Sequence, residues 1–183
     1  MAMSVQTSVT AAPTNGYAGM LDTAAPHHIA TARNGEASAA IPFGRGVVWD
    51  PSSPATDRDV TLPATETDIV MGIAVHGQNF SKSWTDGDGN VHGELSSTGL
   101  LPGTIFGVLR KGRILVVAED ATTAGTDRLW VRCTVGGVGE VLGGLTTADE
   151  GTETIDCTKQ GVWVSTAAAG ALAWLEVDFF NKP

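Results

Sequence analysis

The sequence predicts an all-β fold, an antiparallel β-sandwich or barrel, from three observations. The 183 residues include 23 glycines. Short apolar runs recur along the chain with turn-forming residues between them, which is the pattern of several short strands. Apolar residues spaced three and four apart are never sustained, so no helix longer than about two turns is expected. Spacing alone does not distinguish a sandwich from a barrel.

The chain is predicted to consist of an arm and one domain. Residues 1–15 are small and polar without periodicity, which predicts a flexible N-terminal arm. Residues 16–183 are predicted to form a single β domain with one core, because a chain of this length buries about 70% of its unfolded surface. Within it, residues 77–103 are polar and rich in glycine, and we expect a long loop excursion, partly a hairpin with its tip at Asp86–Gly89.

The stretch Asn15–Asp50 is rich in Gly, Ala and Pro and holds few large apolar residues. Fixing each residue costs about 1–2 kcal/mol, and little apolar area is buried here in return. This stretch is therefore expected to gain its order by lying on other β-structure, either of the same domain or of a neighbouring subunit. Asn34-Gly35 within it is a strong turn signal.

Apolar runs bounded by turn residues predict the strands. The run Ile69–His76 is continuously apolar, as expected for a strand that is covered on both faces. In Leu129–Val135, Arg132 and Thr134 alternate with large apolar residues, so one face is expected to be buried and the other to face water. The remaining predicted strands are Gly44–Trp49, Val60–Leu62, Thr104–Leu109, Arg113–Ala118, Val162–Ser165 and Leu172–Phe179. Arg110-Lys111-Gly112, between two of them, predicts a hairpin turn.

The five tryptophans divide into two groups. Trp49, Trp130, Trp163 and Trp174 lie in predicted strands and are expected in the core, because each hides a large ring. Trp84 lies in the polar excursion near Phe80. An exposed aromatic pair on a loop is a reasonable anchor for an interface.

Charge and hydropathy argue against two classes of partner. The net charge of −9 disfavours direct contact with nucleic acid, which requires clustered Lys and Arg. The N-terminus lacks a basic region followed by an apolar run, and no stretch approaches 18 uninterrupted apolar residues. Neither export nor membrane insertion is therefore expected.

No constellation of residues predicts catalysis, a metal site or a cofactor. There is no G-x-S-x-G elbow and no histidine set with ligand spacing. Cys133 and Cys157 lack C-x-x-C spacing and are expected to be buried free thiols, with a disulfide as the alternative. The DGDGN segment at Asp86 resembles the opening of a calcium loop, but the sixth and twelfth positions of an EF-hand loop hold Val91 and Ser97. A solvated hairpin tip is the favoured interpretation.

Three segments carry a family resemblance: GYAGMLDTAAPHHIATARNGEASAAIPFGRGVV near the N-terminus, and LWVRCTVGGVGEV and WVSTAAAGALAWLEVDF in the distal half. They resemble the structural cement proteins, or head-decoration proteins, of tailed phages. The resemblance implies a jelly roll or related barrel, and a non-enzymatic virion protein on the outer surface of the capsid. It also implies that the partner is the major capsid protein and that the chain self-associates, with a dimer favoured over a trimer.

Partner contacts are expected from the segment Ala18–Pro42 and from the loop Phe80–Leu95. The candidate contact residues are Tyr17, Met20, Leu21, His27, His28, Ile29, Phe80 and Trp84. The alternative function is a glycan-binding or calcium-stabilised accessory β-domain of the virion. A glycan-binding domain predicts exposed aromatic residues beside converging acids, which the order of residues along the chain does not reveal.

Overall fold

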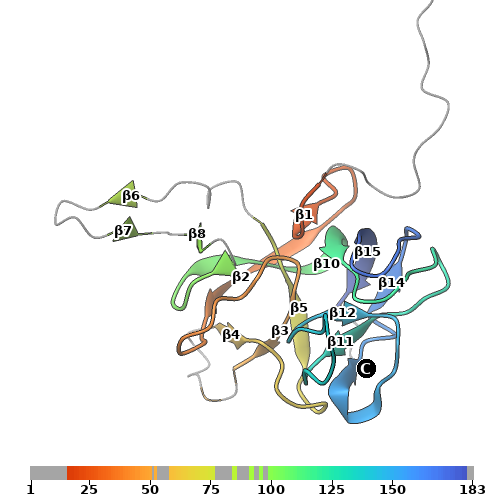
Figure 1. The fold of residues 1–183 in the computed structure, drawn as a ribbon. Helices are drawn as coiled ribbons and strands as arrows, with labels where there is room; N and C mark the ends of the chain where they lie inside the picture. The colour runs from red at the N-terminus through yellow and green to blue at the C-terminus, as the bar shows by residue number, and fades with distance from the viewer. Residues whose placement is uncertain are drawn as a thin grey trace, which may run out of the picture.

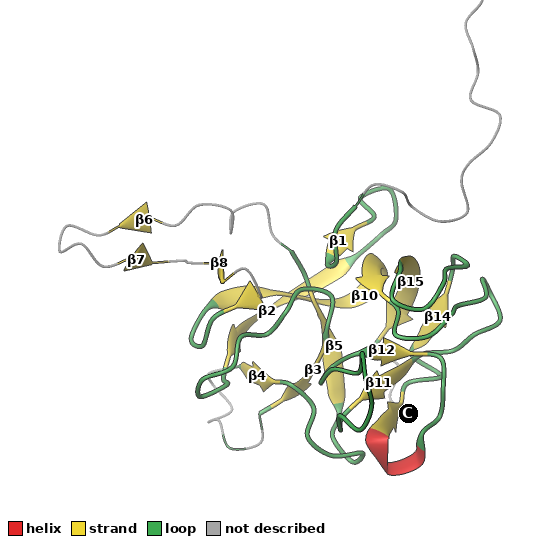
Figure 2. Ribbon diagram, viewed as in Figure 1, coloured by secondary structure: helices red, strands yellow, loops and turns green. Residues whose placement is uncertain are grey.

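The computed structural model describes residues 16–50, 52, 58–76, 84–85, 91–92, 95–96 and 99–180. The described residues form strands and loops, and their one helical element is the 3-10 turn η2 (Gly151–Glu153) (Figure 2). The all-β prediction is confirmed. The predicted arm, residues 1–15, lies outside the described residues.

The N-terminal half closes into a five-stranded barrel. Its strands are β2 (His28–Asn34), β3 (Gly46–Trp49), β4 (Asp59–Thr61), β5 (Val70–Ala74) and the first half of β10 (Ile105–Val117). Around the barrel they follow the order β10-β2-β4-β3-β5, and pairing of β5 with β10 closes the ring. The β2–β4 pair is parallel and the others are antiparallel. The closure favours a barrel over an open sandwich, whereas jelly-roll connectivity stays a prediction.

The C-terminal half adds strands to the second half of β10. There β10 pairs with β15 (Leu172–Asp178) on one side and β1 (Met20–Leu21) on the other, and β14 (Gly161–Trp163) pairs with β15. A three-stranded sheet has the order β12-β11-β13. Bridges from Ala118 to Leu145 and from Arg128 to Val162 connect this sheet to β10 and β14. The bounds of its strands are Leu145–Thr146 for β12, Trp130–Arg132 for β11 and Thr154–Asp156 for β13.

Along the chain, four short strands come between β5 and β10. β6 (Trp84–Thr85) pairs antiparallel with β7 (Val91–His92), and β8 (Leu95–Ser96) pairs with β9 (Gly99–Leu100). The first pairing agrees with the hairpin predicted around Asp86–Gly89. The tip itself lies outside the described residues.

The hairpin predicted at Arg110-Lys111-Gly112 is wrong, because β10 runs through these residues as one strand of 13 residues. Its two halves have different partners: Leu109 pairs with β2 and β5, whereas Ile114 pairs with β15 and β1. Figure 1 shows β10 passing from the barrel toward β15. The strand is irregular between Leu109 and Lys111, and Gly112 has a φ of 128°. The glycine permits this bend and the close approach of His27, whose Cβ would lie 2.8 Å from a Cβ at position 112.

The buried side chains form two hydrophobic clusters where length alone predicted one core. Successive residues of β5 and β10 belong to different clusters. Val108 and Ala74 belong to the barrel cluster, and Leu109 and Ile73 belong to the C-terminal cluster. This confirms that β5 is covered on both faces, as its continuous apolar run predicted. The barrel cluster consists of Ala32, Ile41, Val47, Val60, Ala74, Leu100, Phe106 and Val108.

The N-terminal segment takes its order from β10 of its own chain. Met20 and Leu21 pair with Leu115 and Ile114, and β2 then pairs along the first half of the same strand. Gly19 adds two backbone bonds, donating to the carbonyl of Leu115 and accepting from the N–H of His76. The expectation that this segment lies on other β-structure is confirmed for its described part.

Of the four tryptophans expected in the core, Trp163 belongs to a buried cluster, whereas Trp49, Trp130 and Trp174 do not. Trp163 is fully buried, and Trp130 and Trp174 are partly buried. Trp49, the last residue of β3, is 43% exposed. It is the exposed residue at the end of a strand whose other residues are buried, so strand membership did not guarantee its burial.

Candidate partner-contact surface

Four of the candidate contact residues come together around one hollow. Tyr17, Met20, Leu21 and Ile29 line a cavity of about 510 Å³ together with Thr23, Val75, His76 and Gly107. They come from β1 and the loops on either side of it, the start of β2, the two residues that follow β5, and the first part of β10. We call Tyr17, Met20, Leu21, Ile29 and His76 the Tyr17 face.

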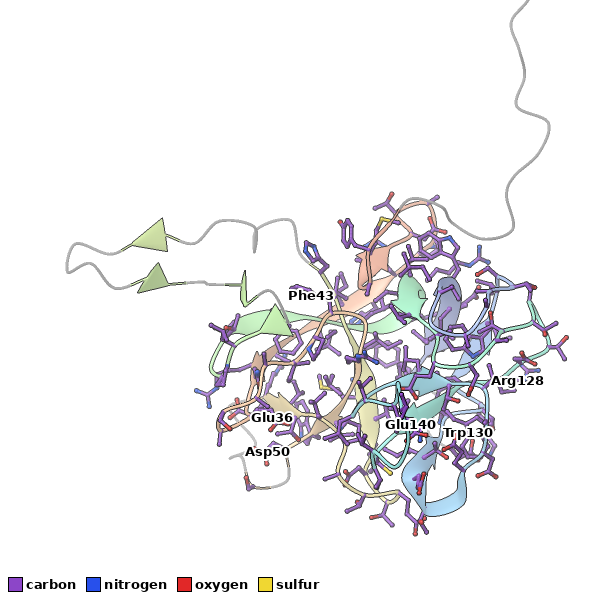
Figure 3. The ribbon with its side chains drawn as sticks, viewed as in Figure 1. Glu36, Phe43, Asp50, Arg128, Trp130 and Glu140 are labelled. Carbon is purple, nitrogen blue, oxygen red and sulfur yellow. The ribbon has the colours of Figure 1, made fainter. Side chains whose placement is uncertain are left out.

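The Tyr17 face combines exposed apolar surface with a fixed aromatic centre. Tyr17 is 44% exposed and Ile29 is 40% exposed. The His76 ring lies 4.5 Å from that of Tyr17 and 4.4 Å from that of Phe43, centroid to centroid. Phe43 lies at the β1 end of the barrel (Figure 3). Aromatic rings held at these distances present a large contact area with little loss of side-chain entropy on binding.

The ring of His76 has one nitrogen without a partner in the part of the chain that the structure describes. Its Nδ1 is buried and makes no hydrogen bond there. The backbone N–H of the same residue donates to the carbonyl of Gly19 at 3.0 Å. Sequence reasoning did not select His76 as a contact residue, because it lies far along the chain from β1.

The two adjacent histidines do not belong to the Tyr17 face. The His28 ring meets the edge of the Phe180 ring at 4.9 Å, and the guanidinium of Arg110 lies 4.5 Å from the centre of the same ring. His27 is exposed, and its Nδ1 lies 3.2 Å from the carbonyl oxygen of Ala25. The two histidines therefore lie beside the irregular part of β10, next to Lys111 and Gly112.

The two loop aromatics are not brought into this surface by the described residues. Phe80 lies outside them. Trp84 belongs to β6, where its backbone pairs opposite His92. Their role as interface anchors stays a prediction.

Arg132 is the charged residue that sequence reasoning placed wrongly. Alternation predicted it on the wet face of its strand, but it is only 1% exposed. Its Nε donates to Glu119 at 2.6 Å, and its two terminal nitrogens donate to the carboxylate oxygens of Glu150 at 2.8 and 2.9 Å. An oxygen of Glu140, which Figure 3 labels, lies 3.4 Å from Nη1 of Arg132. One signal was available: a single arginine followed by several glutamates.

The Arg132 cluster ties the three-stranded sheet to neighbouring loops. Glu119 also accepts the N–H of Val141, and Glu140 accepts the N–H groups of Gly136 and Gly137. The hydrogen bond from Arg132 lowers the pKa of Glu150, and hydrogen bonds to Glu150 and Glu119 raise the pKa of Arg132 against the opposing effect of burial. Both groups are charged at neutral pH, so the cluster is a network of fixed charges.

The cysteines are free and buried, as expected. Burial raises the pKa of Cys157 to about 12, with a further contribution from the charge of Asp156. Burial likewise raises the pKa of Cys133. Thiols with raised pKa values are weak nucleophiles at neutral pH, so these residues act as packing side chains.

The described residues form neither a metal site nor a membrane-spanning helix. Among these residues no group of three or more His, Cys, Asp and Glu side chains is arranged to hold a metal ion. The described part also contains no helix with the length and apolar character needed to span a bilayer.

Comparison with known protein families identifies the chain. The family described as structural cement protein (E217 gp24/Pam3 gp6) matches residues 5–178. The chain belongs to this family. It is therefore a phage structural protein of the virion capsid that associates with capsid proteins, and it is not an enzyme. The family resemblance found in the sequence is confirmed.

Solved structures agree with the fold. A chain from "The capsid of Myoviridae Phage XM1" matches with a TM-score of 0.62 at 18% identity, covering 98% of this chain and 100% of the other. A chain from "The crystal structure of head fiber gp8.5 N base in bacteriophage phi29" matches with a TM-score of 0.38 at 17% identity, covering 84% and 96%. At such identity the first match supports the fold alone. Comparison with curated protein sequences gave no match.

Proposed function

We propose that this protein binds the outer surface of the assembled phage head and stabilises contacts between neighbouring major capsid proteins. Family membership supplies the class of partner. The observation that carries the finer proposal is the Tyr17 face, where exposed Tyr17 and Ile29 stand beside the rigid contact of Tyr17 with His76. Exposed apolar residues gathered on one surface of a small protein are typical of a protein interface.

The mechanism is thermodynamic linkage. A protein that binds the assembled shell and not free capsomers lowers the free energy of the shell, and so shifts the equilibrium toward the intact head. Weak contacts for each subunit suffice, because many identical copies act on one lattice. The net charge of −9 supports a role at the outer surface without direct contact with nucleic acid.

Self-association follows from the same reasoning. A subunit that bridges capsid proteins around a local symmetry axis fits its site best as a closed oligomer, and we favour a dimer over a trimer. The arm, residues 1–15, is proposed to reach a neighbouring subunit, with residues 16–183 as the β domain.

The test compares the two states of the capsid protein. Purified protein is mixed with mature heads that lack it and, separately, with free major capsid protein, and bound protein is measured after sedimentation or by light scattering. We expect saturable binding to heads and at least about tenfold weaker binding to the free protein, since linkage requires differential affinity. Equal affinity for both would contradict the proposal.

A further inference from the structure

A second hollow lies at the opposite end of β5 from the Tyr17 face. It is a groove of about 500 Å³ at the start of β5. Trp49 and Ile69 stand in it, 43% and 75% exposed. Its remaining lining residues are Glu66, Thr67, Asp68, Val70, Met71, Arg110, Ile155, Asp156, Cys157, Gln160 and Phe179. We call it the Trp49 groove.

The groove has an apolar floor and an acidic rim. Three carboxylates line it, from Glu66, Asp68 and Asp156. Burial raises the pKa of Asp68, but hydrogen bonds from the backbone of Ala64 and Thr65 and from the Thr65 hydroxyl outweigh it and leave the pKa below its ordinary value. This rim is therefore negative at neutral pH.

The cation in the lining is already engaged within the chain. The guanidinium of Arg110 lies over the ring of Phe180 and donates to the carbonyl oxygen of Phe179 at 3.4 Å. Three negative charges against one positive charge leave the lining with an excess of two. A ligand that carries cationic groups is favoured here.

One wall of the groove is an unpaired strand edge. β13 has β11 as its one neighbour among the described strands. The backbone N–H of Cys133 donates to the carbonyl of Glu153, and the backbone N–H of Cys157 donates to that of Leu129. Bonded pairs alternate along an antiparallel ladder, so the backbone N–H and C=O of Asp156 point away from β11. Such an edge is a template for an added strand.

We propose that the Trp49 groove binds an extended segment of the major capsid protein in which lysine or arginine alternates with large apolar residues. The segment adds a strand to the free edge of β13. Its apolar side chains enter between Trp49 and Ile69, and its cationic side chains face Asp68 and Asp156. The identity of the partner rests on the proposed function, whereas the chemistry of the ligand rests on the groove.

Charge selects this occupant over a second copy of the chain. The protein has 11 Lys and Arg against 20 Asp and Glu, a net charge of −9. A second copy therefore brings more negative charge to a negative rim, which is unfavourable. Pairing of alternate side chains with pockets is the usual basis of specificity when a peptide extends a sheet.

The first experiment measures binding of a labelled peptide to the full chain by fluorescence anisotropy. The probe is a short capped peptide that alternates lysine with leucine, and the control replaces each lysine with glutamate. We expect saturable binding of the cationic peptide and none of the anionic one. The same cationic peptide with N-methylated backbone on alternate residues should bind at least about tenfold more weakly, because it cannot pair with β13.

Matched variants locate the site. Ile69→Ser should weaken peptide binding about tenfold, the loss expected when a large apolar contact is removed. Ile105→Ser is the control, because Ile105 is 63% exposed and lies outside the groove. If the natural chain shows no saturable binding, or if Ile69→Ser binds the peptide as tightly as the natural chain does, the Trp49 groove is not the binding site. Equal binding of the N-methylated peptide overturns the pairing with β13.

The same variants, mixed with heads, separate this inference from the proposed function. We expect Ile69→Ser to bind heads more weakly than Ile105→Ser. If Ile69→Ser loses the peptide but binds heads like the natural chain, the assignment to the capsid protein is overturned and the proposed function stands. If the natural chain fails to bind heads at all, the proposed function is overturned, and the peptide titration still decides the groove.

Discussion

Replacing Arg132 with alanine is expected to lower the free energy of unfolding by about 3–5 kcal/mol, the range for breaking a buried ion pair by removing one partner. Arg132 is 1% exposed, and its guanidinium donates to both Glu119 and Glu150. Without it, the almost fully buried Glu119 carboxylate loses the donor that lies 2.6 Å away, and the nearest remaining guanidinium, that of Arg45, lies 4.0 Å away. Urea unfolding followed by circular dichroism measures the change.

Two further variants make this prediction specific. Arg113→Ala removes an exposed pair with Glu176 and should change stability by less than about 1 kcal/mol. Arg132→Met combined with Glu119→Leu should be more stable than Arg132→Met alone, because both buried charges are then removed. A loss below about 1 kcal/mol for Arg132→Ala would show that the network contributes little.

Ile29→Asp is expected to weaken binding to heads at least thirtyfold, about the effect of removing one strong interface anchor. Ile29 is 40% exposed and lines the hollow of the Tyr17 face, so the substitution places a carboxylate among apolar contacts. Occupancy of purified heads is measured over a range of protein concentrations.

Ile105→Asp provides the matched control for this surface. Ile105 is an isoleucine on the paired strand β10, it is 63% exposed, and it does not line the hollow. Its variant should bind heads like the natural chain, and circular dichroism should show both variants folded. Unchanged occupancy with Ile29→Asp would exclude the Tyr17 face from the capsid contact.

Local signals were sufficient to locate most strands. The continuous run Ile69–His76 predicted a strand covered on both faces, and β5 contributes Ile73 and Ala74 to different clusters. The Gly- and Ala-rich stretch was expected to lie on other β-structure, and β1 and β2 do lie on β10. In each case the hydrophobic pattern and the entropy cost of ordering the chain predicted the structure that is observed.

The errors arose where partners distant in sequence decide the structure. Arg110-Lys111-Gly112 has the composition of a turn, but the flanking halves of β10 are each held by other strands, so the chain continues. Alternation placed Arg132 in water, because the alternation of a single strand does not show that Glu119 and Glu150 cover it. Trp49 ends its strand at the rim of a groove rather than in a core. Period alone cannot tell a rim from a core.

The candidate site was predictable in part for the same reason. Tyr17, Met20, Leu21 and Ile29 are close in sequence, and pairing with one strand gathers them. His76 joins them through the end of β5, and His27 and His28 turn toward Gly112 and Phe180 instead. Most residues of the Tyr17 face are therefore close in sequence, whereas His76 reaches it through the pairing of the strands.

Stabilisation of the shell is tested by measuring the temperature at which heads lacking this protein rupture, with increasing amounts of protein added. Release of the genome is followed by a fluorescent dye. We expect the rupture temperature to rise with occupancy and to reach a plateau when the sites are filled, because binding stabilises only the assembled shell. Full occupancy with an unchanged rupture temperature would contradict it.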